Sequence, residues 1–407
     1  ETLDVTRGAS LSGEFYATEG EYIRLTCGNF DYQNNCFKEN KSKDNLYYTG
    51  DFRSEFLMEK GDIITPLTEQ AIGLLGSTAI IPESGKYIQS QDVAKIICKE
   101  DLLDKDFAFY LIPSPLVKQQ LSAAAQQTKI RHTSPDKIKD CTVWIPELAE
   151  QKRISKLLRS LDCKIGLNRA INQNLEAMAK QLYDYWFVQF DFPDENGRPY
   201  KSSGGKMIWN EKLKREIPIS WEIKLIDDIA EIYNGATPST MNELNYGGDI
   251  VWITPKDLSD QKQKFIYQGE RNISQVGYDS CSTHLLPSNS ILMSSRAPIG
   301  LLAIAKTELC TNQGFKNFVP KSGNTSIYLY YYLQYHIRQI EQLGTGTTFK
   351  EVSREDILKF PMLKPSDNVL DLWKETVLAI NDRQLEIQKE NENLTKLRDE
   401  LLPLLMN

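Results

Sequence analysis

The sequence predicts a tandem of two α/β (α+β) domains, each followed by a long helix, with the two helices paired as an antiparallel coiled coil. Three observations lead to this architecture: the chain repeats itself at long range, two stretches show coiled-coil periodicity, and the remainder mixes short strands with polar loops. A chain of 407 residues is longer than one ordinary domain. The repeat divides it into two similar parts.

The duplication is clearest where each globular part ends. The segment QQTKIRHTSPDKIKDCTVWIPELAEQKRISKLLRSLD aligns without a gap to TGTTFKEVSREDILKFPMLKPSDNVLDLWKETVLAIN, so that Pro146 matches Pro365. Further upstream, residues 60–75 resemble residues 288–302, and residues 22–30 resemble residues 250–258. An ordered series of three matches indicates two copies of one unit.

The globular parts, residues 1–145 and 222–361, contain short β-branched runs such as AKIIC, GDIVWIT and KNFVP between Gly, Pro, Asn and Asp clusters. Such runs predict strands joined by polar loops. The run 328–343 has helical spacing, and we expect its tyrosines to belong mostly to the core. An aromatic face that stacks on nucleic-acid bases remains the alternative.

Residues 146–189 and 362–407 carry the periodicity of long helices. Their apolar residues recur at steps of three, four and seven, the a and d pattern of a coiled coil. The seam comprises Ile154, Leu158, Leu161, Ile165, Leu175, Leu182 and Trp186 in the first helix, and Trp373, Val377, Ile380, Ile387, Leu394 and Leu401 in the second. A helix of about 40 residues is about 60 Å long at about 1.5 Å per residue.

Two asparagines, Asn172 and Asn391, occupy matching positions on this seam. A buried asparagine in a coiled-coil seam costs stability but fixes the register of the helices, so we predict that role for both. The alternative is that each faces solvent beside a gap in the seam. Residues 190–221 are rich in Pro, Gly, Ser and charge, which predicts a linker that lets the chain fold back and pair its helices antiparallel.

Composition limits the classes of function. The net charge of −7 and pI of about 5.3 argue against a protein that coats DNA through a basic surface, and suggest that a DNA reader of this kind needs a partner. Seven cysteines, an odd and scattered set, predict reduced thiols and a cytoplasmic location. We expect no membrane segment, because no window approaches about 20 apolar residues, and no secretory signal at the first residues.

Motifs of catalysis and metal binding are not evident. GTGTTF (344–349) lacks the lysine of a Walker A loop, no NPPY-type methyltransferase loop occurs, and no GxGxxG follows a strand. The histidines His132, His284 and His336 lie far apart and lack metal-ligand spacing. We therefore predict no catalytic residue, no metal site and no cofactor in this chain.

At this point the residues resemble a known family, the specificity subunits of type I restriction-modification systems. The string IPELAEQKRISKLLRSLDCKIGLNRAINQNLEAMAKQLYDYWF (145–187) is similar to the family's first conserved region. The matching positions are Pro146, Glu150, Gln151, Ile154, Leu158, Leu161 and Asp162. Residues 217–239 resemble its lead into a recognition domain, and LRDELLPLLMN resembles its C-terminal helix. The second copy departs from the pattern, since Val369 and Leu370 stand where the Glu-Gln pair would be.

The resemblance implies a non-catalytic DNA-reading subunit. Residues 1–145 and 222–361 would be target-recognition domains 1 and 2, each reading one half of a bipartite, asymmetric site in double-stranded DNA. The helices would set the unread gap; domains about 34 Å apart meet successive turns of one groove. The implied partners are two modification subunits, which use S-adenosylmethionine to methylate adenine, and restriction subunits, which use ATP and Mg²⁺.

Candidate DNA-contacting residues are polar or basic loop residues, since Arg and Lys suit guanine edges and phosphates, and Asn, Ser and Thr suit base edges. In the first domain they are Arg7, Arg24, Asn29, Lys38, Lys41, Lys43 and Arg53; in the second they are Thr254, Lys256, Arg271, Ser294, Ser295 and Arg296. The repeated segment adds a hydroxyl and a cation in each domain, as expected for a phosphate clamp: Thr128, Lys129 and Arg131, then Thr347, Thr348 and Lys350. The alternative for each is an ordinary solvated side chain.

Two other functions stay open. One is a scaffold that holds two proteins across the helical spacer, which the duplication alone does not distinguish from a DNA reader. The other is a fragment of a fused restriction or methylation enzyme, which requires a methylase loop or nuclease carboxylates. DNA retention at low but not at high salt would favour the reader.

Overall fold

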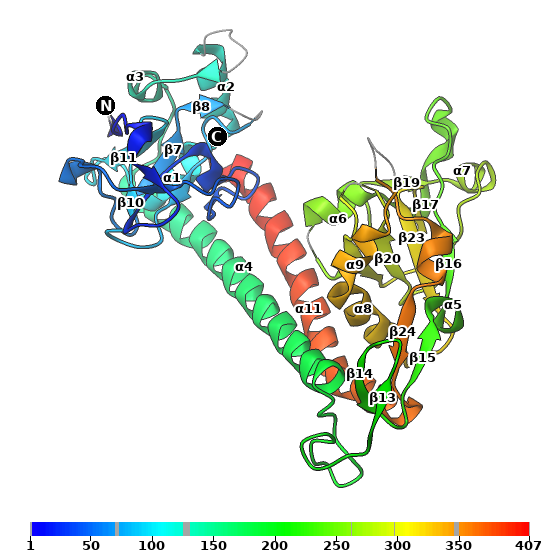
Figure 1. Ribbon diagram of the computed structural model, residues 1–407. Helices are drawn as coiled ribbons and strands as arrows, with labels where there is room; N and C mark the ends of the chain where they lie inside the picture. The colour runs from blue at the N-terminus through cyan, green and yellow to red at the C-terminus, as the bar shows by residue number, and fades with distance from the viewer. Residues whose placement is uncertain are drawn as a thin grey trace. The chain divides into compact units, whose positions relative to one another are not determined.

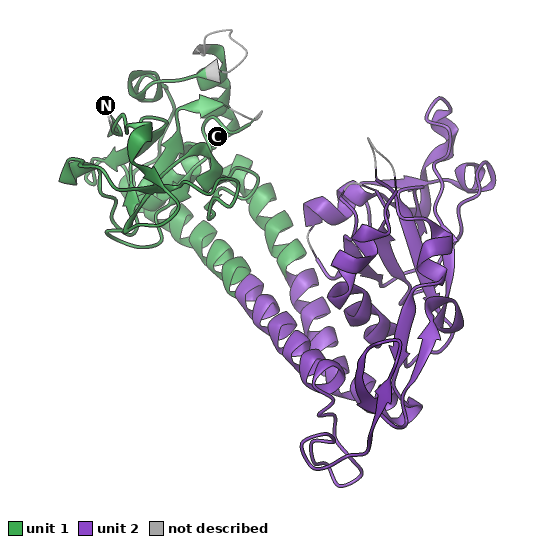
Figure 2. Cartoon of the chain, viewed as in Figure 1, with its two compact units in different colours: residues 1–167, 391–407 green, residues 168–390 purple. Residues whose placement is uncertain are grey.

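The computed structural model describes residues 2–69, 73–124, 131–261, 263–296, 298–345 and 350–406. The chain divides into two compact units, one of residues 1–167 with 391–407 and one of residues 168–390 (Figure 2). Each unit combines one globular domain with part of both long helices (Figure 1). The globular domains therefore each pack on their own portion of the helix pair.

Unit 1 is built on two small sheets. The first runs β1 (Leu3–Arg7), β11 (Val93–Cys98), β7 (Ile63–Pro66) and β9 (Ala79–Ile80), all antiparallel. The second runs β10 (Tyr87–Ile88), β3 (Tyr22–Arg24), β6 (Tyr47–Tyr48) and β2 (Tyr16–Ala17), with β10 and β3 parallel. The described part of the unit also has the pairs β4 (Phe30–Asp31) with β5 (Cys36–Phe37) and β8 (Thr68–Glu69) with β12 (Arg131–His132), the helices α1 (Lys105–Leu111), α2 (Pro115–Ala124) and α3 (Pro135–Lys139), and 3₁₀ turns at Gly13–Phe15, Cys27–Asn29 and Ser54–Phe56.

Unit 2 repeats this plan with longer strands. Its main sheet runs β16 (Ala230–Asn234), β23 (Phe315–Pro320), β20 (Ile291–Ser294), β21 (Leu302–Ala305) and β18 (Phe265–Ile266). A second sheet runs β19 (Arg271–Ile273), β17 (Tyr246–Ile253) and β22 (Cys310–Thr311). The described part also has the pairs β13 (Met207–Asn210) with β14 (Arg215–Pro218) and β15 (Glu222–Leu225) with β24 (Pro361–Lys364), the helices α5 (Ile226–Ile229), α6 (Pro255–Gln261), α7 (Gln275–Asp279), α8 (Ser326–Tyr335), α9 (Ile337–Gln342) and α10 (Arg354–Leu358), and a 3₁₀ turn at Glu243–Asn245. The α/β composition predicted for both domains is confirmed.

Equivalent short helices carry equivalent caps in the two units. Ser134 accepts a hydrogen bond from the backbone N–H of Lys137 at the start of α3. Ser353, its match in the repeat, accepts one from Asp356 at the start of α10. A serine at the N-cap satisfies a backbone donor that the helix leaves unpaired, so the repeat preserves the local folding signal.

The long helices are α4 (Leu148–Tyr183), which continues as a π-turn over Asp184–Val188, and α11 (Asp367–Leu405). In unit 1 the Arg398 guanidinium of α11 pairs with Asp162 of α4 at 3.0 Å. In unit 2 the Asn168 amide of α4 donates to Glu390 of α11 at 2.8 Å. As the residue number of the contact increases along α4, the residue number of its partner decreases along α11. The two helices are therefore antiparallel, as the sequence predicted.

The seam of this pairing is apolar, as the periodicity predicted. Leu158, Ile165, Val377 and Ile387 are each 2% exposed or less. Most tyrosines of α8 are core residues, as expected: Tyr328 and Tyr331 are each 1% exposed, whereas Tyr335 at the end of the helix is 52% exposed.

The linker is more ordered than its composition suggests. Residues 207–210 and 215–218 form the antiparallel β13–β14 hairpin, in which Ile217 is buried. Trp221 follows the hairpin and stacks on Phe192 with ring centroids 5.1 Å apart. Gly, Pro and charge predicted the turns correctly, but short strand pairs of this kind leave little periodicity to detect.

Candidate nucleic-acid interface

Both globular domains present the same turn at the end of a strand. In unit 1 the Asn29 side chain accepts from the Thr26 backbone N–H at 2.9 Å and from the Thr26 hydroxyl at 3.2 Å. In unit 2 the Asp257 carboxylate accepts from the backbone N–H and hydroxyl of Thr254, both at 2.7 Å. The two turns are the upstream segments that match in sequence, so the structure reproduces the repeat in atomic detail.

A second repeated feature joins a strand end to the segment before the last short helix. In unit 1, β8 pairs with β12, and the Thr133 N–H donates to the Leu67 carbonyl at 2.9 Å. In unit 2 the Val352 N–H donates to the Ser295 carbonyl at 3.0 Å, and Arg296 forms a bridge with Glu351. The repeated segment thus docks at the same place in each domain.

In unit 2 these features form one continuous edge. The Ser295 N–H donates to the Gly314 carbonyl at 2.8 Å, and the Asn312 N–H donates to the Ile253 carbonyl at 3.0 Å. A Cβ on Gly314 would lie 2.9 Å from the ring of Pro255, so this close approach requires glycine. We call residues 254–257, 294–296, 312–316 and 350–351 the loop edge of unit 2, and residues 26–29, 67–69 and 131–133 the loop edge of unit 1.

Glu351 forms ion pairs with two cations at the loop edge of unit 2. Its carboxylate pairs with Arg296 at 3.0 Å and with the buried Lys316 at 3.2 Å. Partial burial works to raise the pKa of Glu351, but hydrogen bonds from both cations outweigh it and hold the pKa below its usual value. Arg296 is therefore held in one orientation while its guanidinium remains half exposed.

Four candidate cations of unit 1 are exposed. Lys38 donates its backbone N–H to the Asn29 carbonyl at 3.0 Å, and its side chain is exposed, as are those of Lys41 and Lys43. Arg7, also exposed, donates to the Gln91 carbonyl at 2.8 Å. The structure thus leaves these four candidates available to a phosphate backbone.

Four candidates are buried, which corrects their selection as DNA contacts. Arg24 is 7% exposed, donates to the Asn45 carbonyl, and stacks over Tyr16 at 3.8 Å. Asn29 is 1% exposed and serves the turn described above. Ser294 and Ser295 are fully buried. Hydrogen bonding within the domain occupies Arg24, Asn29 and Ser294, and the Ser294 hydroxyl donates to the Pro298 carbonyl at 2.6 Å.

Four other candidates are at least partly exposed, and each already interacts with a neighbouring residue. Thr254 is half-buried and serves as the turn donor. Lys256 is exposed and pairs with Glu270 at 2.7 Å. Arg271 is exposed over the Tyr246 ring at 4.1 Å. Arg53 is exposed and pairs with Glu55 at 3.4 Å, on the β3–β6 side of unit 1 and outside its loop edge.

The repeated hydroxyl-and-cation segment is described only in part. Thr128, Lys129, Thr347 and Thr348 lie outside the described residues. Arg131 is described by its backbone, which pairs with Glu69, and Lys350 is exposed at the loop edge of unit 2. The phosphate clamp therefore stays a prediction.

Sequence reasoning missed Gln313 at the loop edge of unit 2 and Thr237, which contacts it. Gln313 follows β22, and its amide oxygen accepts a hydrogen bond from the Thr237 hydroxyl, which lies 76 residues earlier in the chain. Both side chains are exposed. An amide presented this way suits an adenine edge. The parallel pairing of β22 with β17 places Gln313 there, and this pairing has no local sequence signal.

Both predicted register asparagines bond across the paired helices, and their role in setting the register stays a prediction. Asn172 donates to the Gln384 carbonyl at 3.3 Å, and Asn391 donates to the Ile165 carbonyl at 3.5 Å. Both residues are half-buried on the seam rather than facing solvent.

The described ranges contain neither a membrane-spanning helix nor a cluster of metal ligands. No helix in them is long and apolar enough to cross a bilayer. No group of three His, Cys, Asp or Glu side chains in them is arranged to hold a metal ion.

The chain is similar in sequence to specificity subunits of type I restriction enzymes. The chain is 40% identical over 203 residues to the type I restriction enzyme MjaIX specificity subunit of Methanocaldococcus jannaschii, a match covering 48% of this chain and spanning about half (47%) of that protein. It is 26% identical over 374 residues to the type I restriction enzyme HindI specificity subunit of Haemophilus influenzae, covering 79% of this chain and 81% of that protein.

Structural comparison and a family model agree with these relatives. The fold matches the S subunit of a type I restriction-modification system from M. genitalium with a TM-score of 0.60 at 14% identity, covering 100% of this chain and 94% of that one. The model of the type I restriction modification DNA specificity domain matches twice, at residues 12–177 and 218–369. Two copies of this domain, together covering most of the chain, place the protein in the type I restriction-modification DNA specificity family.

Proposed function

We propose that this chain reads a bipartite, asymmetric DNA site, with one half-site bound by each globular domain and the paired helices setting the gap. The observation that carries the proposal is the loop edge repeated in both units on one backbone plan with different side chains. Thr68 in unit 1 and Arg296 in unit 2 occupy equivalent positions. Their β-bridge partners, His132 in unit 1 and Glu351 in unit 2, are also equivalent. Two readers of one design and different surface chemistry suit two different half-sites.

The net negative charge of the chain works against its binding to DNA. With a net charge of −7, phosphate contacts at the loop edges compete with repulsion from the rest of the surface. We propose that tight DNA binding requires the partner subunits. Because the chain directs those partners, we assign it no catalytic step.

The helices offer matched surfaces for two copies of one partner. Met178 is 51% exposed and Tyr185 38% exposed on α4 and its π-turn. Their matches in the repeat, Leu397 and Leu404 of α11, are 45% and 76% exposed. We propose that one modification subunit docks at each of these equivalent positions, which is supported by the matching exposure of apolar side chains in the two copies.

The chemistry of the complex belongs to the partners in this proposal. Modification subunits would bring S-adenosylmethionine and methylate adenine, and restriction subunits would bring ATP and Mg²⁺. The seven cysteines, all within the described ranges, form no disulfide, which suits assembly in the cytoplasm.

Mapping adenine methylation in the genome of cells that express the chain with its modification subunit tests this function. The expected result is a new motif of two unlike half-sites separated by a fixed gap. If the complex assembles and no split motif appears, the proposal fails and a protein-binding scaffold takes its place. Cells that lack the chain are the control.

A further inference from the structure

Unit 2 contains a buried lysine that joins its globular domain to the helix pair. Lys264 lies in the turn before β18, and only 7% of its side chain is exposed. Its ammonium donates to the Tyr331 hydroxyl at 2.5 Å and to the Asn381 amide oxygen at 2.7 Å. It also contacts the Glu176 carboxylate and the Gln384 amide oxygen, each at 3.2 Å. We call these five residues the lysine clasp.

The clasp connects three separate elements. Lys264 and Tyr331 belong to the globular domain, Glu176 belongs to α4, and the remaining two residues belong to α11. A buried ammonium is strongly unfavourable unless charge and hydrogen bonds compensate it, and burial lowers the pKa of Lys264 to about 8 although the Glu176 carboxylate opposes this shift. The compensation exists only when domain and helices hold one relative orientation.

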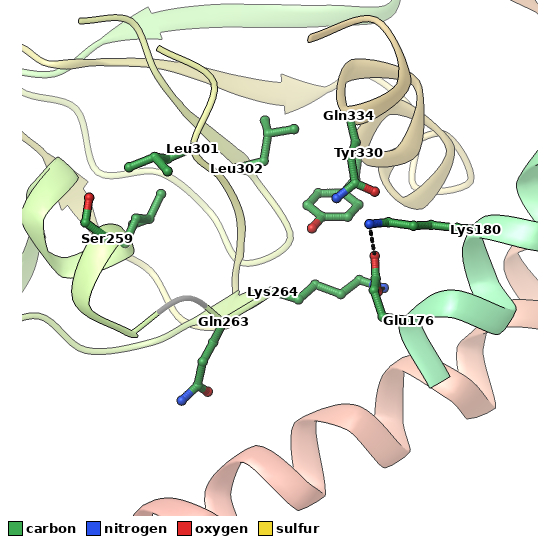
Figure 3. A pocket seen from close by; sticks show the side chains of 10 residues that line it. Glu176, Lys180, Ser259, Gln263, Lys264, Leu301, Leu302, Tyr330 and Gln334 are labelled. Carbon is green, nitrogen blue, oxygen red and sulfur yellow. Dashed lines mark hydrogen bonds and ion pairs between the residues drawn. The ribbon is translucent and has the colours of Figure 1, made fainter. Parts of the chain in front are cut away.

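A pocket open to solvent lies beside the clasp. It has a volume of about 440 Å³ and is lined by Glu176 and Lys180 of α4 and by residues of the globular domain that include Lys264, Leu302 and Tyr330. Figure 3 shows the Lys264 side chain reaching toward Glu176 at its margin. The domain also packs on the helices through an apolar core that includes Tyr183, Tyr328 and Trp373, and the clasp adds directional polar contacts to that packing.

Unit 1 also ties its domain to α4 at the start of that helix. The buried Gln151 of α4 accepts from the Asp104 N–H at 2.8 Å and donates to the Leu102 carbonyl at 3.0 Å, tying the helix to the domain backbone. Its match in the second copy is the buried Leu370, which cannot form such bonds. The clasp lies elsewhere on the helices: the unit 1 match of Asn381 is Asp162, which accepts a hydrogen bond from the Tyr110 hydroxyl at 2.5 Å and pairs with Arg398 at 3.0 Å.

We propose that Lys264 is the positioning residue that fixes the second globular domain on the helix pair and so restricts the gap to one length. The inference rests on the proposed function, because gap selectivity has meaning only for a bipartite reader. If the domain can rotate on its helices, its half-site is met over a range of distances instead of one.

The test is the double variant Lys264→Met with Glu176→Gln, which removes both charges and so leaves no unpaired buried ion. Methylation mapping should return the wild-type half-sites, while methylation of sites with one base pair more or fewer rises about fivefold relative to the wild-type gap. Tyr331→Phe, which removes only one hydroxyl, should shift the same ratio about twofold in the same direction. The control is Lys180→Met, a half-exposed lysine of the same pocket, which should keep the wild-type gap.

Hydrogen exchange supplies a readout independent of DNA. Amides of β18 and α8 should exchange about tenfold faster in the double variant than in Lys180→Met. A wild-type chain with no split motif would reject the proposed function while exchange still tests the clasp. A split motif with an unchanged single gap in both clasp variants, or unchanged exchange, would overturn the role of Lys264.

Discussion

Asn172 donates its side-chain amide across the helix pair to the backbone carbonyl of Gln384 at 3.3 Å. The repeat reproduces this contact, because Asn391 donates to the carbonyl of Ile165 at 3.5 Å and each partner is the match of the other in the duplication. Two symmetric polar contacts on an apolar seam are the arrangement expected of residues that set the register of paired helices.

Replacing both seam asparagines with leucine should raise stability and weaken the register. The Asn172 Oδ1 is buried without a hydrogen-bond partner among the described residues, so its loss together with added apolar burial should stabilise the chain by about 1 kcal/mol. Denaturant unfolding of Asn172→Leu with Asn391→Leu measures this. The exposed Asn174→Leu with Asn393→Leu is the matched control; a seam variant no more stable than that control would contradict the register role.

Arg296→Ala should weaken recognition of one half-site only. The Glu351 carboxylate holds the Arg296 guanidinium at the loop edge of unit 2, and one good base contact contributes about 1–3 kcal/mol of discrimination. Competition binding of the assembled complex to sites altered in either half measures the effect, with Lys212→Ala in the linker hairpin as control. Equal loss at both half-sites would mean that Arg296 contacts the backbone or supports folding.

Gln313→Ala should relax the second half-site at one A·T position. The Thr237 hydroxyl orients the Gln313 amide, and an amide so held suits the adenine edge. Sequencing of DNA selected by the variant complex checks this against Gln339→Ala, an exposed glutamine on α9. Unchanged base preference at every position would remove Gln313 from the reading surface.

The Glu351 network predicts a dependence on acid pH. Because the folded state holds the pKa of Glu351 below its usual value of 4.5, its contribution to stability is present above pH 4.5 and is lost as the pH falls through the lower, folded pKa. The melting temperature of the wild type should exceed that of Glu351→Gln at pH 6, and the difference should shrink toward pH 3. A difference independent of pH would show that the ionised carboxylate is not the stabilising group.

The sequence is most informative about the helices and least informative about the loop edges. Periodicity identified the seam around Leu158 and Val377 because apolar burial imposes a regular spacing on the chain. Residue type alone did not reveal that Arg24 and Ser294 bond within their own domain. Gln313 was missed because strand pairing between distant segments brings it to the edge.

Lengthening the helix pair tests the central claim most directly. Residues 166–172 of α4 face residues 385–391 of α11 in the antiparallel pairing. Duplicating both segments adds seven residues to each helix and about 10 Å to the pair, which is about three base pairs of DNA. Duplicating only one segment is the control and should disrupt the pairing. Methylation mapping should show both half-sites unchanged and a gap longer by about three base pairs; an unchanged gap, or altered half-sites, would contradict the account.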